Sequence, residues 1–243
     1  MSGKGEMKRA ICSLILTALL CSCPLVHGAA QEPLFSVVAK ANLTTAARLF
    51  LNPNASDPYA RAQSVSFTDF FGYGAEIRYH IPGTTLAVGV SADYIVSSDT
   101  RTITAAAQRP VPAEDGYRVI PVELTGYFRI PIIEGRFGVY MGGGLGVYFG
   151  EREYSVAGLS APTTERHPGF GIHVLGGVQY QVTEWFALSA EMKFRDAQFE
   201  ATNSFAVPSV RYRDILVTLP QKPFESSIQT DGMVLQLGAA YSF

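Results

Sequence analysis

The sequence predicts an all-β protein, an eight-stranded antiparallel up-and-down transmembrane β-barrel, and three observations lead to this fold class. Apolar and polar residues alternate with a period of two in eight separate segments. The connections between these segments are alternately short and long, and the chain opens with the features of an export signal. Period-two alternation indicates strands with two unlike faces, and alternating connections around an even strand count are typical of a membrane-spanning barrel.

The first thirty residues have the organisation of a secretory signal peptide. Lys4, Lys8 and Arg9 form a basic start, the run "AICSLILTALLC" is apolar, and "VHGAAQ" supplies small residues for cleavage near Ala30. We therefore expect a signal peptide over residues 1–30 and a barrel domain over 31–243. "LCSC" leaves open an alternative cleavage with lipidation of Cys23. Cleavage after Ala30 removes all three cysteines, which excludes disulfides and thiol chemistry from the mature chain.

The eight segments follow one another in the order of the chain. Each places apolar residues at alternate positions, and charged or small residues occupy the positions between them; for example, Tyr73, Ala75 and Ile77 alternate with Gly74, Glu76 and Arg78. The predicted strands are 35–43, 73–81, 86–96, 120–130, 137–150, 170–182, 185–195 and 233–243. "PGTT", "PIIEGR" and "TEW" are the short turns, predicted to face the periplasm, and the long connections are predicted to face outside.

Alternation alone leaves the direction of the apolar face open, because a soluble sandwich or a ligand-binding barrel would point it inward. Three features favour lipid. The apolar faces have the length that a tilted strand needs to cross a bilayer, aromatic residues gather near both ends of the segments, and the export signal directs the chain out of the cytoplasm. A closed barrel also satisfies every backbone polar group in lipid. We thus predict the outer membrane of a Gram-negative-type bacterium.

The strand plan, with "IPVELTGYFRI", "VYMGGGLGVYFG", "LSAEMKFR" and the closing "LGAAYSF", resembles the small outer-membrane β-barrel superfamily. This group includes the opacity-like proteins, outer membrane proteins W and X, and the barrel domain of outer membrane protein A. The resemblance implies that the terminal residues are read by the outer-membrane assembly machinery. The residues to which this role transfers are Leu235, Leu237, Ala239, Tyr241 and Phe243.

An eight-stranded barrel has a lumen that side chains can fill. The inward positions predict a polar network that specifies the barrel and plugs it, with tyrosines and histidines around it. Its charged members are Lys40, Glu76, Arg78, Asp93, Glu123, Arg129, Glu191, Lys193 and Arg195. A proton or solute path is the alternative, and the likeness to outer membrane protein W implies a narrow conduit for small hydrophobic or ionic solutes.

Other functions find little support in the sequence. Removal of residues 1–30 changes the formal charge from −2 to −4, which gives no reason to expect nucleic acid as a partner. The histidines lack a nearby serine, paired carboxylates or metal-ligand spacing, so we predict no catalytic, cofactor or metal site. The expected partners are membrane lipid and a surface ligand bound through the loops 52–69, 98–116, 151–168 and 197–230. A ten-strand barrel stays open if 210–219 also crosses.

Overall fold

The computed structural model describes residues 33–104, 109–131 and 135–243, and Pro33–Phe243 form one compact unit. The predicted signal peptide lies outside the described residues. Among those residues, no helix is long and apolar enough to cross a membrane. The elements are β1 (Phe35–Phe50), α2 (Pro58–Arg61), β2 (Ser64–His80), β3 (Leu86–Thr104), β4 (Pro110–Ile130), β5 (Phe137–Val156), β6 (Leu159–Ala161), β7 (Thr163–His167), β8 (Gly169–Gln181), β9 (Phe186–Asn203), β10 (Ser209–Tyr212), β11 (Ile215–Thr218), β12 (Phe224–Gln229) and β13 (Met233–Ser242).

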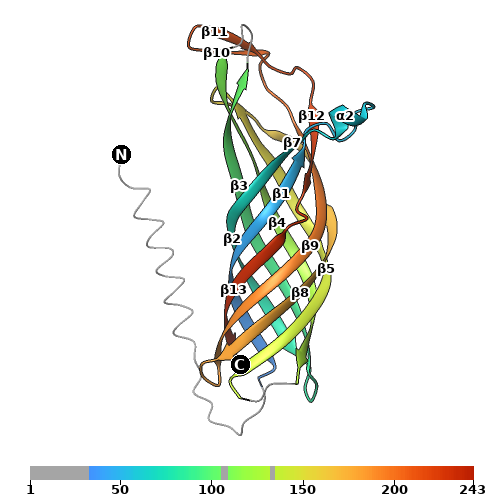
Figure 1. Ribbon diagram of the computed structural model, residues 1–243, viewed down its shortest axis with the longest axis vertical. Coiled ribbons are helices and arrows are strands. Elements are labelled where there is room, and N and C mark those ends of the chain that lie inside the picture. The colour runs from blue at the N-terminus through green and yellow to red at the C-terminus, as the bar shows by residue number, and fades with distance from the viewer. Residues whose placement is uncertain (1–32, 105–108, 132–134) are drawn as a thin grey trace, which may run out of the picture. The chain divides into compact units, whose positions relative to one another are not determined.

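Eight antiparallel strand positions close into a ring, and this confirms the predicted fold class (Figure 1). The order around the ring is β1, β2, β3, β4, β5, β8, β9 and β13, and β13 pairs back with β1. Two backbone hydrogen bonds join Phe35 and Phe243, with N–O distances of 3.1 and 2.9 Å. The ring therefore has no free edge at the level of these strands.

Two successive strands, β12 and β13, fill the eighth position of the ring. Both lie between β1 and β9, and residues 230–232 separate β12 from β13. A side chain at Gly232 would place its Cβ 2.3 Å from the carbonyl oxygen of Ala46, so only glycine allows the backbone at 232 to lie this close to β1. Opposite this interruption, the buried residues of β1 change from even positions up to Thr44 to odd positions from Ala47.

The short connections at one end match the predicted turns, since they occupy 81–85, 131–136 and 182–185. At the other end, the predicted bounds of the loops are partly wrong, because strands occupy part of these ranges. Strands continue through 98–104, 110–116, 151–156, 197–203 and 224–229, so β4 alone runs for 21 residues. A membrane crossing needs only about 9 to 11 residues. The paired strands thus extend well beyond a bilayer at the loop end.

The β10–β11 hairpin forms a separate two-stranded sheet, with Val210 opposite Val217. It lies at the loop end, opposite the C-terminus (Figure 1). The segment 210–219 therefore adds no strand to the ring, which excludes the ten-strand alternative.

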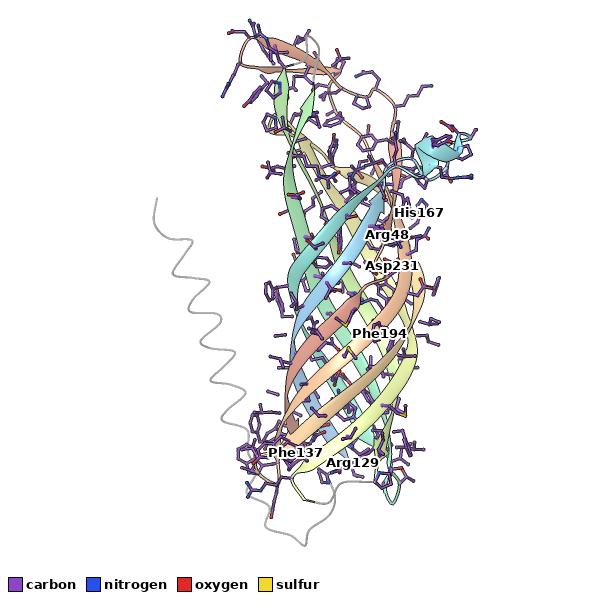
Figure 2. The ribbon with its side chains drawn as sticks, viewed as in Figure 1. Arg48, Arg129, Phe137, His167, Phe194 and Asp231 are labelled. Atoms are coloured by element: carbon purple, nitrogen blue, oxygen red, sulfur yellow. The ribbon has the colours of Figure 1, made fainter. Side chains whose placement is uncertain are left out.

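The outer wall is apolar between two bands of aromatic side chains. The turn-end band contains Phe35, Tyr79, Phe137, Trp185 and Phe243, and the loop-end band contains Phe71, Tyr73, Phe149, Phe170 and Phe194. Figure 2 shows Phe137 at the turn end and Phe194 about halfway along the barrel. Leu, Val, Ile and Met side chains between the bands remain exposed, as lipid-facing residues must.

Candidate functional site: the lumen of the barrel

The first charged layer of the lumen joins residues from three strands. Arg78 on β2 contacts Glu76 with an Nε–Oε1 distance of 2.6 Å, and its Nη2 lies 2.6 Å from Oε1 of Glu191 on β9. Lys40 on β1 forms an ion pair with Glu76 and lies 3.9 Å from Glu191. All four side chains are buried. The two carboxylates therefore share two cations across the lumen, which offsets part of the cost of burying the charges.

Two tyrosines complete this layer. The hydroxyl of Tyr140 donates to Glu191 at 2.7 Å, and the guanidinium of Arg78 lies over the ring of Tyr127 at 4.1 Å. Because Arg78 both donates hydrogen bonds and stacks, a lysine could not replace its contacts.

The second charged layer is an ion pair between Lys193 on β9 and Glu123 on β4. Their Nζ and Oε2 atoms are 2.6 Å apart, and both side chains are at most 1% exposed. The hydroxyl of Tyr148 donates to the other Glu123 oxygen at 2.8 Å. Nearby, the His173 ring and the Thr125 hydroxyl are hydrogen-bonded at 2.9 Å.

Inward glycines make room for the large side chains of the lumen. A Cβ at Gly177 would lie 2.7 Å from the ring of Tyr140, and one at Gly89 would lie 2.3 Å from a carboxylate oxygen of Glu76. These positions therefore accept no side chain unless the network moves.

Three predicted network members differ from the rest. Asp93 and Arg195 are buried in the lumen, but Asp93 forms no ion pair with a described residue and the guanidinium nitrogens of Arg195 have no hydrogen-bond partner there. Arg129 is exposed at the turn end, where Figure 2 shows it near Phe137. Its position in the alternation is inward, yet it lies one residue from the end of β4, at the mouth of the lumen. Arg129 therefore lies outside the buried layers, and its part in the lumen network stays a prediction.

An apolar layer follows the charged layers toward the loop end, and the sequence reasoning missed it. The ring of Tyr117 packs edge-on against Phe67 and Phe70, with centroid distances of 5.5 Å to each, and against Phe199 at 6.3 Å. Leu49, Val65, Ile95, Val119 and Ile228 belong to the same buried cluster. The sequence of β9 could have predicted this layer, because the inward positions of Lys193 and Arg195 continue as Ala197, Phe199 and Ala201.

A second apolar cluster covers the loop end above this layer. Side chains of the β10–β11 hairpin, including Val217, pack with Val111 of β4, Val156 of β5 and Phe205. Beneath them Arg152 donates two hydrogen bonds to the buried Asp115, at 2.9 and 2.7 Å. Burial raises the pKa of Tyr154, whose ring packs against Phe205 and Phe224 beside Arg152.

The outer surface of this protruding region is charged. Arg118 lies 3.0 Å from Glu151 and also pairs with Glu153. Arg48 pairs with Asp231 across the ring closure, and Figure 2 shows both toward the loop end. Polar side chains therefore face outward where the lumen is apolar, the reverse of the arrangement between the aromatic bands.

The C-terminal residues with a predicted assembly role lie on the lipid-facing side of β13. Leu235, Leu237, Tyr241 and Phe243 are exposed, and Ala239 is partly buried. The ring of Phe243 stacks on Phe35 with centroids 6.3 Å apart. Their recognition by the assembly machinery stays a prediction.

The described histidines lie at separate places, and the spacing along the sequence did not show that one of them meets a serine. His80 is hydrogen-bonded to Ser36 at 2.9 Å at the turn end, and His167 is exposed on β7. Within the described ranges, no group of three His, Cys, Asp or Glu residues could hold a metal ion.

A closed ring of eight antiparallel strands, with a lipid-compatible wall and buried charged side chains inside, defines an integral β-barrel membrane protein. The family model described as "Outer membrane protein beta-barrel domain" matches residues 14–243, and the chain belongs to this family. The protein is thus located in the outer membrane of a Gram-negative-type bacterium. That its short turns face the periplasm and its loop end faces outside stays a prediction.

Solved structures similar to this chain include an outer membrane protein, a surface protein and an attachment protein. OprG from Pseudomonas aeruginosa is 14% identical, with a TM-score of 0.55 and coverage of 88% of this chain and 97% of OprG. Neisserial surface protein A is 15% identical, with a TM-score of 0.45 over 86% and 97%. The attachment invasion locus protein of Yersinia pestis, in complex with the heparin analogue sucrose octasulfate, is 13% identical, with a TM-score of 0.43 over 87% and 99%. No curated protein matches in sequence.

Proposed function

We propose that this protein is a non-conducting outer-membrane barrel with a structural or surface-interaction role and no catalytic activity. The observation that carries the proposal is the packing of the lumen. Two ion-paired layers, centred on Arg78 and Lys193, are followed by the aromatic layer around Tyr117, and each contains side chains that are almost fully buried. A hydrated solute would have to displace ion pairs and an apolar layer in succession, which opposes passive flow.

The extracellular end is the part left to act on other molecules. Its strands extend past the aromatic band, its outer wall carries charged side chains, and the β10–β11 hairpin presents Arg211 and Leu216 outward. Rigid scaffolds commonly hold binding residues in such positions. Replacement of residues 209–218 by a short Gly-Ser linker should leave the barrel folded and reduce contact in a whole-cell adhesion assay.

A narrow conduit is the second candidate, and Arg195 favours it. This guanidinium is buried without a hydrogen-bond partner among the described residues, so its N–H groups are available to an anion in the lumen. An ion path would use such a group because the ion-paired cations are already neutralised.

Single-channel recording in planar bilayers separates the two candidates. We expect no steady openings from the wild-type protein, with insertion verified by heat-modifiable gel migration. A variant with Arg78→Ala and Tyr148→Ala, which truncates both charged layers, should leak more, and Leu188→Ala on the lipid face should stay silent. Steady wild-type openings that Arg195→Met abolishes would overturn the closed barrel and support the conduit.

A further inference from the structure

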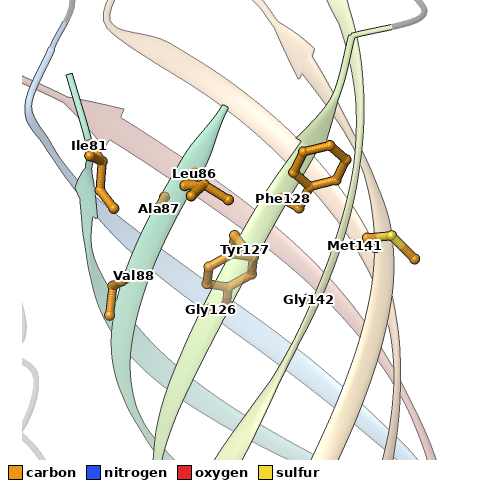
Figure 3. Close-up of a pocket in the computed structure, with 9 residues that line it drawn as sticks. All are labelled: Ile81, Leu86, Ala87, Val88, Gly126, Tyr127, Phe128, Met141 and Gly142. Atoms are coloured by element: carbon orange, nitrogen blue, oxygen red, sulfur yellow. The ribbon is translucent and has the colours of Figure 1, made fainter. Parts of the chain in front are cut away.

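A groove opens in the lipid-facing wall where β3, β4 and β5 approach the periplasmic end (Figure 3). Its volume is about 380 Å³, within the range of about 300 to 1,000 Å³ of ligand pockets. The lining residues are apolar or small, and their side chains project around the strands in the close-up: Ile81, Leu86, Ala87, Val88, Gly126, Tyr127, Phe128, Met141 and Gly142.

The groove exists because two neighbouring strands carry glycine at facing outward positions. Gly126 of β4 lies opposite Gly143 of β5, and a Cβ at Gly126 would meet only the Gly143 carbonyl oxygen, at 3.8 Å. Phe128 and Met141 rise on the periplasmic side of this bare backbone, and Met141 is 53% exposed. The wall therefore has an indentation between large apolar side chains.

The position of the groove determines what can occupy it. It lies within the apolar band, between the aromatic residues that mark the two membrane interfaces, and Phe137 of the periplasmic band stands two outward positions below Met141 on β5. Hydrocarbon, not water, surrounds the barrel at this level. The available apolar chains are those of phospholipids in the periplasmic leaflet.

The start of β5 supplies charge for a lipid headgroup. Arg136 immediately before β5 is exposed and forms no ion pair with a described residue. Arg129 of β4 lies over the lumen mouth instead, since its Nε is 3.3 Å from the Cβ that a side chain at the inward Gly138 would have. Guanidinium groups suit phosphate oxygens, and arginines at membrane interfaces extend toward headgroups.

We propose that this groove is a binding site for one acyl chain of an anionic glycerophospholipid from the periplasmic leaflet, with the phosphate at the level of Arg136. The site holds the lipid longer than the remaining outer wall, because the chain contacts backbone as well as the side chains of Phe128 and Met141. It shares Tyr127 with the first charged layer of the lumen, but it requires neither a closed lumen nor a surface ligand.

Photo-crosslinking of the full-length folded barrel tests the proposal. The probe is phosphatidylglycerol with a diazirine in its acyl chain, diluted into phospholipid nanodiscs, and the labelled positions are mapped by peptide mass spectrometry. We expect several-fold more label per residue on Val88, Phe128 and Met141 than on Leu237 of β13, although Leu237 is 68% exposed. Equal labelling of the two walls would overturn the site.

A pair of leucine variants makes the test specific. Gly126→Leu fills the groove without a backbone clash, and Ala75→Leu on β2 adds a leucine at an exposed outward position whose cross-strand partners, Ala39 and Ala92, do not line the groove. Gly126→Leu should lower groove labelling to the level of Leu237, whereas Ala75→Leu should leave it unchanged. If both retain the enrichment, or if cross-links join two protein copies through the groove, no acyl-chain site exists there. Heat-modifiable migration verifies that both variants fold.

Discussion

The ion pair between Lys193 and Glu123 gives the sharpest test of how the lumen is stabilised. At an N–O distance of 2.6 Å, two unit charges attract each other by about 6 kcal/mol at an effective dielectric constant of about 20. Desolvation of both ions offsets much of this attraction. Since both side chains are almost fully buried, the free energy of unfolding should respond strongly when only one charge is removed.

Lys193→Met removes the cation and leaves the Glu123 carboxylate buried with only the Tyr148 hydroxyl as a hydrogen-bond donor. We expect the free energy of unfolding to fall by about 3 to 5 kcal/mol, as for other broken buried ion pairs. The double variant with Glu123→Met removes both members of the pair, so neither is left buried without its partner. It should therefore be more stable than the Lys193→Met single variant, despite carrying an additional substitution.

Reversible urea unfolding in phospholipid vesicles, followed by heat-modifiable migration and Trp185 fluorescence, measures these differences. Leu188→Met on the lipid face is the control and should change stability little. A cost below about 1 kcal/mol for Lys193→Met would show that water reaches the pair and screens it. A double variant whose loss equals the sum of the two single losses would likewise refute an interaction between the two side chains.

Three further changes should have distinct outcomes. Deletion of Phe243 should reduce insertion in cells, measured in outer-membrane fractions, more than refolding in detergent; equal insertion would count against an assembly role. Arg152→Leu leaves Asp115 buried without its cation and should speed tryptic cleavage of the 209–218 hairpin while the membrane part stays heat-modifiable. Because burial raises the pKa of Tyr154, its contribution is complete below the ordinary value of about 10 and is lost as the pH rises through the raised folded-state value. Alkaline pH should therefore speed the same cleavage, and Tyr154→Phe should weaken this dependence; an unchanged pH profile would contradict the assignment.

The strand ring and its turns were predictable because lipid imposes a simple pattern. Every residue on one face of a crossing strand must be apolar, so segments such as 86–96 and 120–130 show uninterrupted alternation. The continuation of the strands into the predicted loops was not predictable in the same way. In 98–104 the outward positions face water and become polar, so the contrast between the two faces is lost although the pairing with β4 continues.

The pairing of the charged residues depends on geometry that a linear sequence does not show. Alternation places Arg78 and Glu191 inward, but strand tilt and register bring these residues of β2 and β9 together across the lumen. Alternation also fails where a strand exchanges its inward and outward positions. In β1 the buried positions are even up to Thr44 and odd from Ala47, beside the gap between β12 and β13. Alternation places Arg129 inward as well, but the face of a strand does not tell how far a residue lies from the lumen mouth.

The reversal of polarity along β9 indicates where the membrane ends. Up to Phe194 the strand carries apolar side chains outside and charged ones inside, whereas from Ala197 it carries Gln198 and Glu200 outside and Phe199 inside. Lipid around the barrel favours apolar side chains on the outside, and water favours polar ones there. β9 meets both conditions because its outward side chains change from apolar to polar along the strand. Lys193 and Phe199 point into the same lumen, yet Lys193 is stabilised by a countercharge and Phe199 by the hydrophobic effect. The protruding part therefore has an apolar core like that of a soluble barrel.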